Sequence, residues 1–259
     1  MPEVIFQEVK PGIGVITLSE PTALNAMDEA MAEVFQEKIK AVRAMPLRVL
    51  IITGAGRAFS AGGNLDMLEA KAKLSREENT SRMLKFYESF LCIRELGIPL
   101  IAAVNGHAIG AGLCLALACD MRVVAEDAKL GMTFTRLGLH PGMGGTYFLK
   151  EVVGKAAALE LLLTGRVIRG EQVRQFGIAR EMCPGNDVLS RAEEIASEII
   201  ECGPLATKQL LKTLRGKDAE LEAALIREAE CQSENYASAE FLEGVRAVRE
   251  KRSPRFSEM

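Results

Sequence analysis

The chain has 259 residues, of which 48% are hydrophobic, so it can bury a large core and is not predicted to be disordered. Its formal net charge is −3 and its Lys and Arg residues are spread along the chain, which excludes a basic surface for nucleic acid. The six cysteines show no CxxC spacing, which argues against a zinc site and against a disulfide framework.

The N-terminal residues lack the charged segment and the apolar run of a signal peptide. The sequence also contains no apolar stretch of about 18 residues, the length needed to span a bilayer. We therefore expect a cytoplasmic protein with reduced cysteines, no membrane partner and no bound metal.

The first half of the chain predicts strands that alternate with helices. The predicted strands are residues 4–9, 14–18, 48–53, 99–104 and 121–125, and the predicted helical segments are residues 28–42, 65–96 with interruptions, and 111–119. Such alternation is typical of an α/β fold with a mostly parallel, right-handed arrangement.

From about residue 189 onward the apolar pattern is only helical. The predicted helices there are residues 189–201, 204–214, 221–237 and 239–251. We therefore divide the chain into a core of residues 1–190 and a C-terminal helical region of residues 191–259, which covers or extends the core.

Two glycine-rich turns follow predicted strands, one after Thr53 and one after Asn105, and each leads into a helix. Their likeness suggests successive ββα turns of a spiral that bring two equivalent loops together. Neither turn matches GxGxxG or GxxxxGK[ST], which argues against a nucleotide phosphate loop. Amides at such turns can instead stabilise a developing anion such as a thioester enolate, although the glycines could simply permit tight turns.

The chain resembles the crotonase (enoyl-CoA hydratase/isomerase) superfamily in six ordered segments. They are residues 21–26, 52–54 with 58–65, 101–120, 138–146, 163–165, and 243–244 with 250–252. The resemblance implies a ββα-spiral core, a C-terminal helical trimerisation region and a homotrimer or dimer of trimers. It also implies an acyl-CoA substrate, with coenzyme A entering as part of that substrate and no further cofactor required.

Carried over by motif, the two oxyanion amides of the superfamily fall on Gly63 and Ala111. The second position is usually glycine, so Ala111 keeps the N–H donor but narrows the allowed backbone angles. The residues that the resemblance places against the acyl-CoA are Thr22, Ala23, Leu24, Ala61, Gly62, Gly63, Asn64, Leu65, Gly110, Phe134 and Lys251.

The two glutamates that activate water in enoyl-CoA hydratases are missing from the matching positions, which hold Cys114 and Phe134. Hydration needs a base for the water and an acid for the α-carbon. Phenylalanine cannot titrate, and an unperturbed thiol with a pKa of about 8.5 is a poor substitute. We therefore expect hydration to be slow or absent.

Three further side chains are candidates for proton transfer. His107 follows the second glycine turn, and His140 lies on the 138–146 loop, where several relatives supply an aspartate two residues further on. Cys114 shares a helix face with Ala111, and a helix N-terminus can lower a thiol pKa. Each also has a simpler interpretation, as a hydrogen-bonding spacer for the histidines and as a packing residue for the cysteine.

The sequence therefore predicts an enzyme that processes an acyl-CoA thioester through a stabilised enolate, by isomerisation, decarboxylation or hydrolysis. Residues 138–146 also look similar to crotonase-type decarboxylases of polyketide assembly, whose C-terminal histidine falls near Gln232 here. A catalytically silent acyl-CoA-binding or scaffold protein is the alternative, and a family member acting on a diketone without coenzyme A is a third possibility.

Overall fold

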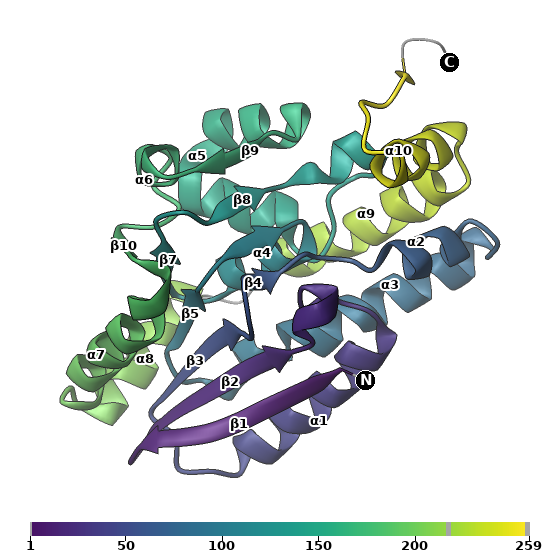
Figure 1. Cartoon of the computed structure of the whole chain (residues 1–259). Helices are drawn as coiled ribbons and strands as arrows, with labels where there is room; N and C mark the ends of the chain where they lie inside the picture. The colour runs from purple at the N-terminus through teal and green to yellow at the C-terminus, as the bar shows by residue number, and fades with distance from the viewer. Residues whose placement is uncertain (1, 216–218, 257–259) are drawn as a thin grey trace.

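The structure is a computed structural model and describes residues 2–215 and 219–256. It contains two mixed sheets (Figure 1). The larger has the order β1-β2-β3-β5-β7-β10, with bounds Glu3–Lys10, Ile13–Ser19, Val49–Gly54, Leu100–Val104, Met121–Ala125 and Glu181–Cys183. The smaller has the order β4-β6-β8-β9, with bounds Ala58–Ser60, His107–Ile109, Lys129–Gly131 and Val167–Arg169.

Helices surround these sheets. The α-helices are α1 Glu29–Arg43, α2 Leu65–Lys71, α3 Arg76–Leu91, α4 Ala111–Ala118, α5 Gly145–Thr164, α6 Glu171–Gln175, α7 Val188–Ile200, α8 Pro204–Arg215, α9 Ala219–Tyr236 and α10 Ala239–Arg249. The 3-10 helices are η1 Pro21–Ala23, η2 Cys92–Leu96, η3 Thr133–Leu137 and η4 Gly185–Asp187. None of these described helices is long and apolar enough to cross a membrane.

The chain winds as the predicted ββα spiral. β3 is followed by β4, β5 by β6 and β7 by β8, so each turn adds one strand to each sheet before a helix begins. Within each sheet, the strands of successive turns pair in parallel. The predicted α/β fold with its spiral core and C-terminal helices is confirmed.

Burial explains why the central elements are apolar throughout. Every residue of β3 is buried, as is every residue of α4, because both lie between other layers of the fold. The outer helix α1 shows only one apolar face, and it begins where the Asp28 carboxylate accepts a hydrogen bond of 2.9 Å from the Met31 amide.

The C-terminal helices α9 and α10 return to the core of their own chain. α9 packs against α3, and α10 lies beside α2 (Figure 1). The Arg249 guanidinium at the end of α10 bonds to Asp66 at 2.5 Å and to Glu69 at 2.6 Å, both on α2. These helices therefore form one wall of the space beside α2 and α3.

The predicted boundary between residues 190 and 191 falls inside α7. That helix packs against β3, β5 and β7, so its contacts belong to the larger sheet. The division into a core and a C-terminal region stays a prediction.

Candidate active site

Parallel pairing of β4 with β6 brings the two glycine-rich loops against each other. The contact is so close that a Cβ atom on Gly62 would lie 2.3 Å from the Ile109 carbonyl oxygen and 3.3 Å from the Ala111 nitrogen. Gly62 also has a φ of +84°, so both the close approach and the backbone angle require glycine at this position.

The amides of Gly63 and Ala111 donate no hydrogen bond to any other residue within the described ranges. By contrast, the preceding amides of Gly62 and Gly110 donate within the fold, at 3.1 and 2.8 Å. Ala111 is the first residue of α4, where helix N–H groups lack an internal acceptor and partial positive charge accumulates. Both free donors belong to residues that line one cavity.

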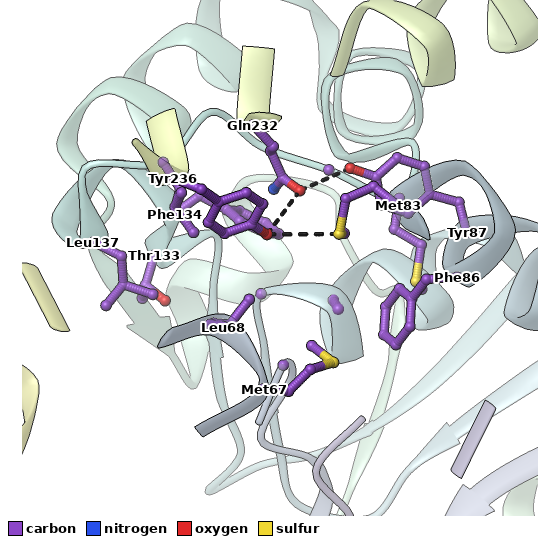
Figure 2. Close-up of a pocket in the computed structure, with 16 residues that line it drawn as sticks. Met67, Leu68, Met83, Phe86, Tyr87, Thr133, Phe134, Leu137, Gln232 and Tyr236 are labelled. Atoms are coloured by element: carbon purple, nitrogen blue, oxygen red, sulfur yellow. Dashed lines mark hydrogen bonds between the residues drawn. The ribbon is translucent and has the colours of Figure 1, made fainter. Parts of the chain in front are cut away.

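This cavity has a volume of about 60 Å³ and a largely apolar lining (Figure 2). Its walls come from both glycine loops, from α2 and α3, from η3 with the loop that follows it, and from α9. The lining residues are Gly63, Met67, Leu68, Met83, Phe86, Tyr87, Gly110, Ala111, Thr133, Phe134, Leu137, Leu139, Gly142, Met143, Gln232 and Tyr236.

A cluster of three polar side chains lies within this apolar wall. Tyr87 on α3 donates a hydrogen bond of 2.8 Å to Gln232 Oε1 on α9, and the Tyr236 hydroxyl lies 3.4 Å from the same oxygen (Figure 2). The amide nitrogen of Gln232 donates in turn to the His140 carbonyl at 2.8 Å. The cluster therefore spans α3, α9 and the loop that begins at residue 138.

Burial controls the protonation of both tyrosines. It is the main cause that raises the pKa of Tyr87 well above its ordinary value, and the nearby Tyr236 and Glu228 raise it further. Burial also raises the pKa of Tyr236. Both phenols are therefore protonated at neutral pH and act as hydrogen-bond donors and weak acids instead of bases.

Among the described residues that line the cavity, none carries a carboxylate, an imidazole, an ammonium or a thiol. Phe134, at the position where the resemblance implies a hydratase glutamate, lines the cavity. Cys114 is fully buried behind the lining, and its thiol contacts the Gly142 carbonyl at 3.3 Å. Burial, assisted by Glu228, raises the pKa of this thiol well above its usual value, the opposite of the lowering that a helix N-terminus could give.

Neither histidine is brought to the cavity. His107 begins β6, at the opposite end of that strand from Ala111, and its Nδ1 accepts a hydrogen bond of 3.3 Å from the Lys129 amide. His140 lies on a separate groove between α5 and α9, with its Nδ1 2.7 Å from the Pro141 carbonyl oxygen. Burial lowers the pKa of both imidazoles.

Most residues predicted to contact coenzyme A lie on one connected surface beside the cavity. Ala61 donates to the Leu24 carbonyl at 2.9 Å, so the segment with Thr22 and Ala23 is joined to the segment that leads through Gly62 to Asn64 and Leu65. Gly63, Gly110 and Phe134 line the cavity itself. Lys251 is exposed just beyond α10.

The buried side chain of Asn25 fixes this joined surface. Its Nδ2 donates to the carbonyl oxygens of Ala55 and Ala58 at 2.9 and 2.8 Å, while its Oδ1 accepts from the Glu20 amide at 2.8 Å. One amide group thereby satisfies polar atoms from two loops that would otherwise be buried without partners.

Two features of the site were not predicted from the sequence. Neither Tyr87 nor Tyr236 belongs to a recognisable motif. Both lie on amphipathic helices, where a tyrosine on the apolar face is interpreted as a core residue. Glu228 on α9 is buried and accepts hydrogen bonds from the Gly144 amide at 2.7 Å and the Thr146 amide at 2.8 Å. Burial raises its pKa to about 7. These bonds fix the beginning of α5 and the loop that carries Gly142.

Metal ligands do not gather in the described parts of the chain: no group of three or more His, Cys, Asp or Glu side chains has a geometry that could hold an ion.

Comparisons with known proteins agree with this architecture. The sequence model of the family described as enoyl-CoA hydratase/isomerase matches residues 8–259. The 2,3-dehydroadipyl-CoA hydratase of Escherichia coli is 34% identical, covering 93% of this chain and 94% of that protein. The mitochondrial enoyl-CoA hydratase domain-containing protein 2 of Mus musculus is 33% identical, covering 95% of this chain and 84% of that protein. A crystal structure of enoyl-CoA hydratase from Bacillus halodurans superposes with a TM-score of 0.86 at 26% identity, covering 94% of this chain and 99% of that one.

Proposed function

The chain belongs to the enoyl-CoA hydratase/isomerase family, and on that premise we propose that it decarboxylates a malonyl-type acyl-CoA, in which a carboxylate is attached to the α-carbon of the thioester. The amides of Gly63 and Ala111 bind the thioester oxygen in this proposal. The observation that carries it is a cavity with two unused amide donors and no side chain that could serve as a base.

The reactions open to this family make different demands on the site. Hydration and isomerisation need a positioned base, and hydrolysis needs an activated water. Decarboxylation needs an acceptor for an electron pair and, afterwards, a proton donor. The lining of this cavity has Phe134 at one of the two glutamate positions and offers the Tyr87 hydroxyl as a proton donor, so it meets only the last set of demands.

In the proposed reaction, the bond between the α-carbon and the carboxylate breaks, and its electron pair enters the thioester to give an enolate and CO2. The amides of Gly63 and Ala111 stabilise the negative oxygen, which in a water-poor site lowers the barrier by several kcal/mol. A proton then reaches the α-carbon from the Tyr87 hydroxyl, which solvent reprotonates. The products are CO2 and the shortened acyl-CoA.

The remainder of coenzyme A lies, in this proposal, along the joined surface of residues 20–27 and 61–65, with Lys251 near its phosphates. Support comes from the exposure of Thr22 and Lys251 and from the fixed geometry that Asn25 gives to both loops. We further propose a homotrimer or a pair of trimers, because α8 exposes the apolar side chains of Leu205, Leu210 and Leu214. Light scattering tests this assembly.

A panel of thioesters tests the reaction. Malonyl-CoA and methylmalonyl-CoA are offered beside crotonyl-CoA, a 3-enoyl-CoA and butyryl-CoA, and the products are identified by mass spectrometry. We expect CO2 and the shortened acyl-CoA from a malonyl-type substrate, and no hydration of crotonyl-CoA. Hydration, isomerisation or hydrolysis as the main reaction would overturn the proposal, and tight binding without any turnover would identify a silent acyl-CoA-binding protein.

A further inference from the structure

Two separate hollows of the molecule meet at the ring of Phe86. One is the cavity described above, and the other is a surface groove between α1 and α3, lined among others by Ala32, Glu33, Arg82 and Lys85. Of the described residues, Phe86 alone lines both. Its ring is therefore the partition between them.

Phe86 is held firmly in this position. It is 5% exposed, and its ring meets that of Phe90, one turn further along α3, edge to face with 5.1 Å between the ring centroids. Phe90 in turn packs against Phe35 on α1, with 5.2 Å between centroids. Because aromatic pairs of this geometry are favourable beyond their area of burial, the ring does not swing aside freely.

Phe134, which lies beside the candidate oxyanion site, and the partition Phe86 both belong to the cavity lining. Gly110, next to Ala111, lies against the ring of Phe134: a Cβ atom built on it would be 3.8 Å from that ring. Figure 2 shows Phe134 and Phe86 on opposite sides of the cavity lining. An acyl chain whose carbonyl is bound at Gly63 and Ala111 therefore extends toward Phe86.

The space available before the partition is short. A cavity of about 60 Å³ holds only a few water molecules, which suits an acyl group of a few carbon atoms. Beyond Phe86, the open groove is lined by Ala32 and by the polar residues Glu29, Glu33, Arg82, Lys85 and Ser89. The methylene stems of arginine and lysine side chains can cover an apolar chain in such a groove.

We propose that Phe86 sets the maximum length of the acyl chain, and that its removal joins the cavity to the α1–α3 groove so that long acyl chains bind. This inference rests on the proposed acyl-CoA function, but it is independent of which reaction the protein catalyses.

The test compares binding of butyryl-, octanoyl- and dodecanoyl-CoA to the whole chain by titration calorimetry. For the wild type we expect the affinity for dodecanoyl-CoA to be no higher than that for butyryl-CoA. For Phe86→Ala we expect the ratio of the two affinities to shift at least tenfold toward dodecanoyl-CoA. Leu91→Ala is the matched control, because it removes a buried apolar side chain from the same helix, lines neither hollow and is not part of the ring contacts that hold Phe86.

Equal losses for all three chain lengths in Phe86→Ala, or the same shift in Leu91→Ala, would overturn the proposal. If Phe86→Ala does not fold, Phe86→Leu is measured in its place, with a smaller shift expected in the same direction and an unchanged ratio contradicting it. Failure of the wild type to bind butyryl-CoA at all would instead reject the acyl-CoA function on which the inference rests.

Discussion

Tyr87 donates its hydroxyl hydrogen to Gln232 across 145 positions of sequence, and the backbone of Gly142 leaves the space in which this bond forms. A Cβ atom at position 142 would lie 2.6 Å from the Tyr87 oxygen and 2.7 Å from the Gln232 amide nitrogen. Both atoms belong to side chains, so a methyl group there displaces the polar pair and not the backbone.

We therefore expect Gly142→Ala to fold and to lose activity. Displacing the hydroxyl proposed to protonate the enolate should lower kcat roughly 10- to 100-fold, since positioned proton transfer contributes at least that much. The kcat of the variant and of the wild type is measured on the thioester that the wild type converts. Gly203→Ala is the control, because the nearest atom to its added methyl group lies 4.0 Å away. Unchanged turnover in Gly142→Ala would show that the Tyr87–Gln232 pair does not serve the reaction.

The buried carboxyl of Glu228 predicts a particular dependence of stability on pH. Its pKa in the fold is about 7, against an ordinary value of 4.5, so between these pH values the folded chain retains a proton that the unfolded chain has lost. Stability contributed by this group is therefore present below pH 4.5 and is lost as the pH rises toward 7, by about 3 kcal/mol in total.

Glu228→Gln removes that dependence. Urea unfolding of the wild type and the variant between pH 5 and 8 should show a free energy of unfolding that falls with rising pH in the wild type relative to the variant. Glu230→Gln, an exposed change on the same helix, should follow the wild type. Parallel curves for Glu228→Gln and the wild type would contradict the raised pKa.

Asn25→Asp should destabilise the fold although the two side chains have the same shape. The aspartate cannot donate, so the carbonyl oxygens of Ala55 and Ala58 lose their partner, and the new carboxyl group lies in the fully buried place of the Asn25 amide. Leaving buried polar atoms unsatisfied costs roughly 3 kcal/mol in the free energy of unfolding. Denaturant titration measures this loss, with Asn186→Asp at an exposed position as the control. A change as small as that of the control would mean that Asn25 does not join the two loops.

The sequence predicted several long, patterned elements, but it gave no prediction for α5 at Gly145–Thr164. The strand expected at residues 48–53 is β3 at Val49–Gly54, and the helix expected at residues 204–214 is α8 at Pro204–Arg215. The three-residue strands β4, β6, β8, β9 and β10 were not predicted, because alternation over three residues has no measurable period. Their pairing is set by the spiral as a whole.

The candidate site was predictable only in part. Gly63 and Ala111 could be placed by motif, since each follows a strand and opens a helix. Tyr87 and Gln232 could not, because they meet only when α9 folds back onto α3. His107 and His140 were candidates because they are the only two histidines of the sequence. The sequence position of a loop residue does not predict which cavity its side chain faces, and neither histidine lines this cavity.

The amide of Ala111 can be removed with little disturbance of the helix that carries it. Ala111 is the first residue of α4, the position where proline is tolerated best in a helix because that N–H has no internal acceptor. Ala111→Gly keeps the amide and serves as the matched control. Both variants are compared with the wild type for unfolding stability before any assay.

The most direct test of the proposed oxyanion site is the turnover of Ala111→Pro beside that of Ala111→Gly. Loss of one such donor should reduce kcat roughly 100- to 1000-fold in the proline variant, whereas the glycine variant should stay within a few-fold of the wild type. A folded Ala111→Pro protein that converts its thioester at the wild-type rate would contradict the account.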